Sequence, residues 1–156
     1  MLGWLWAALR SGARVGVPAG AIVGLIAGVG GSLFTGSLLS LASLAATVFL
    51  LLALLLPLMF YVSLVNNSAT AQQAQALAAV AWLPAYLLGV VAFMMPVVMA
   101  PFIFGKGVTF DNSAEWYSQV FDALGIGRLV LVAIVSALGF VVAAAIAQRR
   151  FSRSSS

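Results

Sequence analysis

Few residues of this chain could take part in catalysis or metal binding, and its three acids lie in one short stretch. Asp111, Glu115 and Asp122 fall between two long apolar segments. Clustered carboxylates bind hard cations such as calcium, and paired carboxylates hydrolyse glycosides. However, the stretch lacks the dense ligand spacing of a calcium loop, and no second polar loop is large enough to complete a substrate cleft. We therefore expect a solvated polar face at these residues.

The chain contains no histidine and no cysteine. It therefore lacks the usual ligands for haem or zinc, the thiols for a disulfide, and the base of a Ser-His nucleophile. The three methionines Met94, Met95 and Met99 have no such residue beside them, so we interpret them as adaptable packing. The sequence predicts no catalytic residue, no cofactor and no metal ion, and we expect the protein not to be an enzyme.

The composition indicates a membrane protein. Hydrophobic residues make up 64% of the 156 positions and charged residues only 6%, whereas soluble domains average about 45–50% and about 25%. A transmembrane helix needs about 20 apolar residues, and four uncharged stretches reach that length. We therefore expect an all-α membrane protein that forms a single bundle of four transmembrane helices. The predicted spans cover residues 15–34, 38–65, 76–104 and 129–147.

Arginines at both ends of the chain predict its orientation. Arg10 and Arg14 precede the first span, and Arg149, Arg150 and Arg153 follow the last. Because basic flanks stay on the cytoplasmic side, both termini are expected there, in agreement with an even number of spans. We expect a bacterial or archaeal inner membrane, with an organellar inner membrane as the alternative. The separation of the basic residues argues against nucleic-acid binding.

Short segments flank the predicted bundle. Residues 1–14 carry Trp4 and Trp6 but are too short to span, so an interfacial segment is expected, because indole rings favour the headgroup level. Residues 148–156 form a basic, serine-rich tail. Its three arginines are expected to touch anionic lipid headgroups or to fix the topology.

A small residue recurs at every fourth position through the first span. In lipid, such GxxxG rows let two helix backbones approach closely, so this glycine zipper is predicted to be a helix-packing face. Three partners stay open: the second span, another membrane subunit, or further copies of this chain around a pore. The row consists of Gly12, Gly16, Gly20, Gly24, Gly28, Ser32 and Gly36, and a second, shorter row in the fourth span of Gly139, Ala143 and Ala147.

Prolines interrupt the second and third spans. Pro57 is expected to kink the second span, because its ring clashes with the preceding turn. Pro84, Pro96 and Pro101 fall in the third span, where no ionisable side chain accompanies them. We therefore favour structural kinks over a transport site, with Pro96 and Pro101 near the end of the span.

The loop before the fourth span predicts a short amphipathic helix over residues 113–124. Asn112 followed by Glu115 is typical of a helix start, and Gly125 is a plausible stop. The helix is expected to lie on the outer membrane surface, with its apolar side against lipid or a partner. Glu115 and Asp122 fall on the polar side, and Trp116, Val120 and Leu124 on the apolar side.

These features together predict a non-enzymatic accessory or scaffold subunit that packs against a larger membrane protein complex through its small-residue faces. Its expected partners are other membrane protein subunits and lipids. The alternative is a small homo-oligomeric channel or transporter, lined by Ser40, Ser43, Thr47 and Ser63. The proline-bearing pattern of four spans also resembles Yip1-type membrane trafficking proteins in its hydropathy, and this resemblance implies a role in membrane trafficking or organisation.

Overall fold

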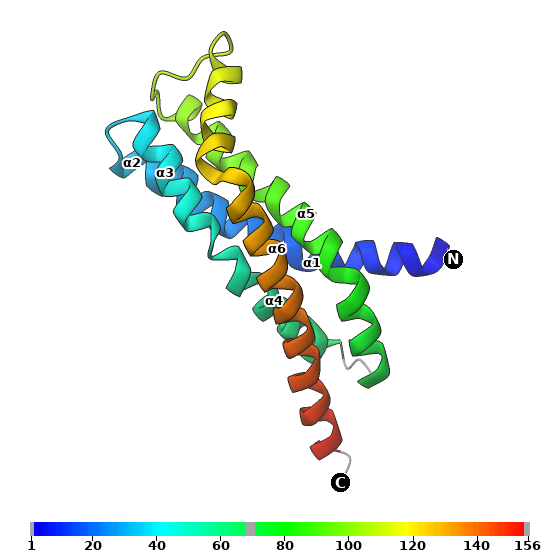
Figure 1. Ribbon diagram of the computed structural model, residues 1–156. Coiled ribbons are helices and arrows are strands. Elements are labelled where there is room, and N and C mark those ends of the chain that lie inside the picture. Colours follow the sequence, from blue (N-terminus) through cyan, green and yellow to red (C-terminus); the bar gives the residue numbers. More distant parts are fainter. Residues whose placement is uncertain (1, 68–70, 155–156) are drawn as a thin grey trace.

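The computed structural model describes residues 2–67 and 71–154, and within these ranges it contains helices and no strand (Figure 1). Apolar, alanine- and leucine-rich stretches form the helices, since in lipid every backbone polar group must be paired within the segment. The elements in order are α1 (Leu2–Leu25), the π-helical turn η1 (Ile26–Gly30), α2 (Gly31–Phe34), α3 (Leu38–Phe49), α4 (Leu52–Asn66), α5 (Ala71–Ile103) and α6 (Ser113–Ser154).

Among the residues that the structure describes, three helical stretches are long and apolar enough to cross a membrane: Leu2–Phe34, Gln73–Ile103 and Ser113–Arg153. Together, α3 and α4 are also long and apolar enough to cross a membrane, but the two helices are bent by 42° at a short break between them. This pair is either one broken span or a re-entrant loop. Over residues 2–67 and 71–154, the structure therefore confirms an all-helical fold with three to four apolar helices compatible with membrane insertion.

Two helix pairs form the body of the bundle. The first, α1 with α5, joins segments that are distant in the sequence, and the second joins α4 with α6. Figure 1 shows α6 running along the length of the bundle, whereas the start of α1 projects to one side. Stacked or tilted phenylalanines fill the interior: the ring centroids of Phe60 and Phe140 are 4.2 Å apart, and those of Phe49 and Phe93 5.1 Å.

The connections at the upper end of Figure 1 are tied by polar contacts. The side chain of Ser37 caps α3 by accepting a hydrogen bond from the backbone N–H of Ser40. The chain leaves α5 through Gly105 and Gly107, both in the left-handed conformation that favours glycine. Between them, Lys106 donates from Nζ to the backbone oxygen of Thr35 at 2.8 Å. The two loops are thereby held together.

Three helix irregularities lie close to one another. One is the π-helical turn Ile26–Gly30, and the second is the break that follows Phe49. The third is Pro96, which has no N–H to donate to the preceding turn of α5. Phe93 connects them, because its ring touches Phe49 and its backbone lies against Gly24, just before the π-helical turn.

Several helix boundaries differ from those expected. The N-terminal segment is continuous with the first span, since α1 begins at Leu2. The third helix begins at Ala71 instead of residue 76 and ends at Ile103, so Pro96 and Pro101 lie near its end as expected. It passes through both prolines because membrane helices tolerate proline when neighbouring helices cover the freed backbone groups. The bend in the second span lies before α4 begins at Leu52, and Pro57 itself lies inside α4. Finally, α6 stays helical into the basic tail.

Candidate functional site

The glycine row of α1 packs against the backbone of α5. A Cβ atom added at Gly16 would overlap the carbonyl oxygen of Ala85, and one at Gly20 would overlap that of Gly89. Only glycine allows this approach, which brings Cα hydrogens of α1 to carbonyl oxygens of α5. The other members in contact are Gly12 and Gly24 of α1 and Gly28 of the following turn η1, which meet Pro84, Phe93 and Pro96, respectively.

The sequence left three partners open for this row, and the structure shows a different one, the third predicted span. α5 presents small residues, among them Ala85, Gly89 and Ala92, so that two backbones can meet. By contrast, α3 offers the side chain of Leu41, which lies against Gly31 of α2. The part of the row from Gly12 to Gly28 is therefore covered by α5 within the chain, which leaves no space there for a helix of another subunit or of a second copy.

The two remaining members of the row differ from the glycines. Gly36 lies in the loop before α3, and a Cβ atom there would meet nothing within 4 Å. Ser32 is buried, and its hydroxyl has no hydrogen-bond partner in the described part of the chain. The contact with α5 thus ends near Gly28.

The small-residue row of α6 also packs within the chain. A Cβ atom at Gly139 would lie 2.8 Å from the Cβ of Pro57 in α4, so the proline ring occupies the space that a side chain would need. Ala143 and Ala147 are buried. Next to this contact the rings of Phe60 and Phe140 stack with an interplanar angle of 6°. Pro57 therefore serves as a packing residue as well as a helix irregularity.

The segment expected as a separate surface helix is the first part of α6. Trp116, Val120 and Leu124 are buried in the same core as the other helices, so the apolar side rests on this chain's own bundle. Glu115 and Asp122 are exposed, as the pattern of polarity predicts. The backbone leaves the helical conformation at Gly125, where φ is 65° and ψ is 153°, so α6 consists of two helices that meet at a kink there, at the predicted stop.

The three acids do not converge. Asp111, Glu115 and Asp122 are all exposed. Within residues 2–67 and 71–154, no three side chains of His, Cys, Asp or Glu lie close enough to hold a metal ion.

Three of the four hydroxyl residues considered as a pore lining face away from the bundle. Ser40, Ser43 and Thr47 are exposed on α3, and Ser63 of α4 is half-buried. Thr47 donates its hydroxyl hydrogen bond to the backbone oxygen of Ser43, at 3.0 Å, within its own helix. These residues therefore line no space inside one copy of the chain.

Sequence patterns did not indicate the hydrogen bonds that join the helices. Tyr86 of α5 donates from its hydroxyl to the backbone oxygen of Leu129 in α6 at 2.7 Å. Near the opposite end of α6, Gln75 donates to Gln148 at 3.3 Å. Each pair joins residues far apart in the chain, and neither residue type nor spacing carries a local signal for such pairs.

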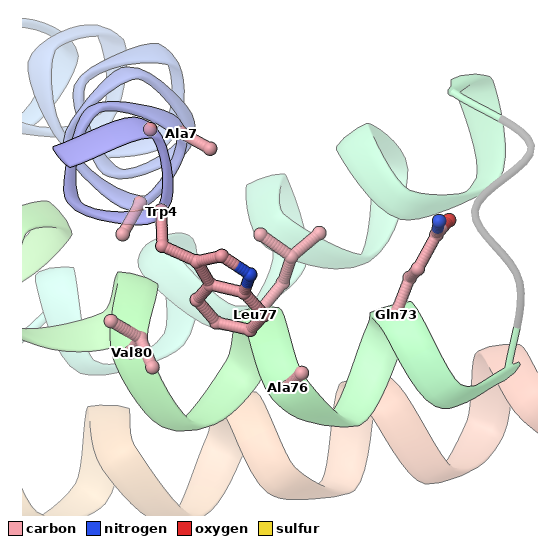
Figure 2. Close-up of a pocket in the computed structure, with 8 residues that line it drawn as sticks. Trp4, Ala7, Gln73, Ala76, Leu77 and Val80 are labelled. Atoms are coloured by element: carbon pink, nitrogen blue, oxygen red, sulfur yellow. The ribbon is translucent and has the colours of Figure 1, made fainter. Parts of the chain in front are cut away.

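A shallow cleft separates the beginnings of α1 and α5 (Figure 2). Its volume is about 480 Å³, and the side chain of Trp4 reaches from α1 over α5 toward Leu77. Trp4 nevertheless remains 60% exposed. The contact places this indole beside the start of α5, where the polar side chain of Gln73 lies at the cleft.

No protein family model, no curated protein and no solved structure matches this chain.

Proposed function

We propose that this chain is a non-enzymatic integral membrane subunit that crosses the membrane four times and packs against a larger membrane protein. The observation that supports this proposal is an unoccupied row of hydroxyl residues on α3. Ser40, Ser43 and Thr47 are exposed, although α3 is otherwise rich in leucine and alanine. Small and hydroxyl-bearing residues concentrate where membrane helices pack against each other.

The rest of α3 faces inward and leaves this row as its outer surface. Leu41, Ala42, Ala45 and Ala46 are buried against the bundle, whereas the hydroxyl row lies on the other side of the helix. Because the glycine row of α1 and the contact at Gly139 are used inside the chain, the α3 row is the small-residue face that we assign to the partner. Hydrogen bonds between membrane helices contribute about 0.6 kcal/mol each, so close packing supplies most of the affinity.

Replacing Ser43 by leucine is expected to release the partner. A tagged full chain purified from its native membrane in a gentle detergent should carry foreign subunits in a fixed ratio, and Ser43→Leu should lose them because the larger side chain separates the two helices. Val141→Leu is the matched control, since Val141 is exposed on α6, away from the row. Unchanged co-purification with Ser43→Leu would contradict docking through α3.

A second candidate function follows from the same row. Several copies arranged with their α3 helices inward would surround a pore lined by hydroxyl groups. In that case the purified protein is a homo-oligomer, and Ser43→Leu or Thr47→Leu lowers flux in reconstituted vesicles. A homo-oligomer without flux would remove the channel, and bound foreign subunits favour the accessory function.

The proposed topology counts α3 and α4 as one broken span and places both termini in the cytoplasm of a bacterial or archaeal cell. The first part of α6 then lies at the outer surface. Because the chain has no cysteine, single cysteines can report sidedness. We expect a membrane-impermeant maleimide to label Gly36→Cys and Ser118→Cys from outside, and Asn66→Cys and Ser152→Cys only after the membrane is opened. Labelling of Asn66→Cys from outside would instead indicate a re-entrant loop.

A further inference from the structure

An open groove of about 660 Å³ runs between α4 and α6. Residues of both helices form its walls, and apart from Tyr61 every residue that lines it is apolar. On α6 the wall extends from Val135 to Ile146, which corresponds to about 16 Å at a rise of about 1.5 Å per residue. That length is about half of the roughly 30 Å hydrocarbon thickness of a bilayer. The groove is therefore about as long as one lipid leaflet is thick.

The floor of the groove is closely packed. Gly139 lies directly against the ring of Pro57, so the two helices touch there and diverge on the groove side. Behind this contact the stacked rings of Phe60 and Phe140 fix the separation of α4 and α6. The groove is thus preformed by core packing.

One end of the groove is cationic. Tyr61 lies at this end, and its hydroxyl accepts a hydrogen bond from Nη1 of Arg150 at 3.4 Å. Arg150 follows Ile146 by one helical turn, on the same side of α6, and the neighbouring Arg149 is exposed. Asp122 lies far away, before the turn of α6 at Gly125. A guanidinium group and a phenol therefore stand where the apolar walls end.

We infer that this groove binds one anionic phospholipid, with an acyl chain along the apolar walls and the phosphate at Arg150 and Tyr61. Guanidinium groups bind phosphate through charge-assisted hydrogen bonds, and basic sites between membrane helices bind anionic headgroups. The length of the groove along α6 favours a lipid over a helix of another protein, because a spanning helix would need a contact surface through both leaflets. The phospholipid thus matches the groove in length and polarity, and its negative charge is complementary to the arginine at the end of the groove.

Native mass spectrometry of the full chain in detergent tests this inference. We expect one phosphatidylglycerol to bind per chain at least about tenfold more tightly than a phosphatidylcholine with the same acyl chains. Each arginine near a headgroup strengthens binding about fivefold, so the double variant Arg149→Gln/Arg150→Gln should lose the headgroup preference. Arg128→Gln, which removes an exposed charge close to Gly125, should retain it. Equal binding of both lipids by the unmodified chain would overturn the inference.

A second pair of variants tests the apolar walls while leaving the charges intact. Val142 lines the groove, so Val142→Trp should fill it and weaken binding of both lipids at least about tenfold. Val141→Trp, at the next position outside the groove, should bind them like the unmodified chain. If Val142→Trp alone dissociated a dimer, the groove would hold a second copy instead of a lipid.

Inorganic phosphate distinguishes a lipid site from a simple anion site. Because the acyl chain supplies apolar contact that free phosphate lacks, millimolar phosphate should displace little of the bound phosphatidylglycerol. Complete displacement at that concentration would show that the arginines bind phosphate without the groove, and would overturn the inference.

Discussion

Gly20→Leu is expected to destabilise the bundle by about 3 kcal/mol, because overpacking at this position meets a backbone instead of a flexible side chain. Even the Cβ atom at Gly20 would overlap the carbonyl oxygen of Gly89. Relief requires α1 and α5 to separate, and α1 would then lose the close approach that runs from Gly12 to Gly28. The added leucine raises the hydrophobicity of the span, so membrane insertion should persist. Thermal unfolding in mild detergent, followed by circular dichroism, measures the loss.

The matched control is Gly3→Leu in the same helix. A Cβ atom at Gly3 meets nothing within 4 Å, and leucine is the better helix former, so this variant should melt at or above the temperature of the unmodified protein. Similar melting of the two variants would contradict a close contact between α1 and α5.

Phe140→Ala is expected to cost about 3 kcal/mol, because it removes a large buried side chain and leaves a cavity beside α4. Phe140 is 0% exposed, and its ring stacks on Phe60 at 4.2 Å. In lipid the loss comes mainly from van der Waals contact, since the bilayer is itself apolar. The control is Phe34→Ala, because Phe34 is 88% exposed. Unfolding in mild detergent measures the stability of both variants, and equal stabilities would contradict the packing of Phe140 against Phe60.

A double-mutant cycle isolates the ring contact itself. Combining Phe140→Ala with Phe60→Ala should destabilise the protein by less than the sum of the two single changes, with a coupling of about 1 kcal/mol. Strict additivity would show that the two rings contribute independently.

The sequence predicted the helical class and the small-residue faces better than their partners. Spacing of four identified the glycine row of α1, because helix periodicity is a local property. The helix that packs against this row must itself present small side chains, and α5 does so with Ala85, Gly89 and Ala92. Alanine and glycine are common throughout this chain, so their presence in α5 carries no distinct signal.

In the first part of α6, the sequence likewise predicted which residues are polar or apolar but not what the apolar side packs against. The polarity pattern correctly separated Glu115 and Asp122 from the buried Trp116, Val120 and Leu124. It did not identify what covers the apolar side, because lipid and protein both offer hydrocarbon to such a face. The end of this segment at Gly125 was predicted, since the backbone leaves the helical conformation there, whereas the start of α1 at Leu2 was not.

The α4–α6 groove has no local signature in the sequence. Tyr61 and Arg150 are 89 positions apart, and each residue type is ordinary at the end of a membrane helix. Only the packing of Pro57 against Gly139 brings the two helices into the register that joins a cationic end to an apolar wall.

The pairing of α1 with α5 also sets an order for biosynthesis. Because α3 and α4 are translated between them, α1 enters the membrane before the helix that covers its glycines has been made. During that interval the row faces lipid or the insertion machinery, and α1 lacks its main contact. Docking of α1 must therefore wait until α5 has left the ribosome.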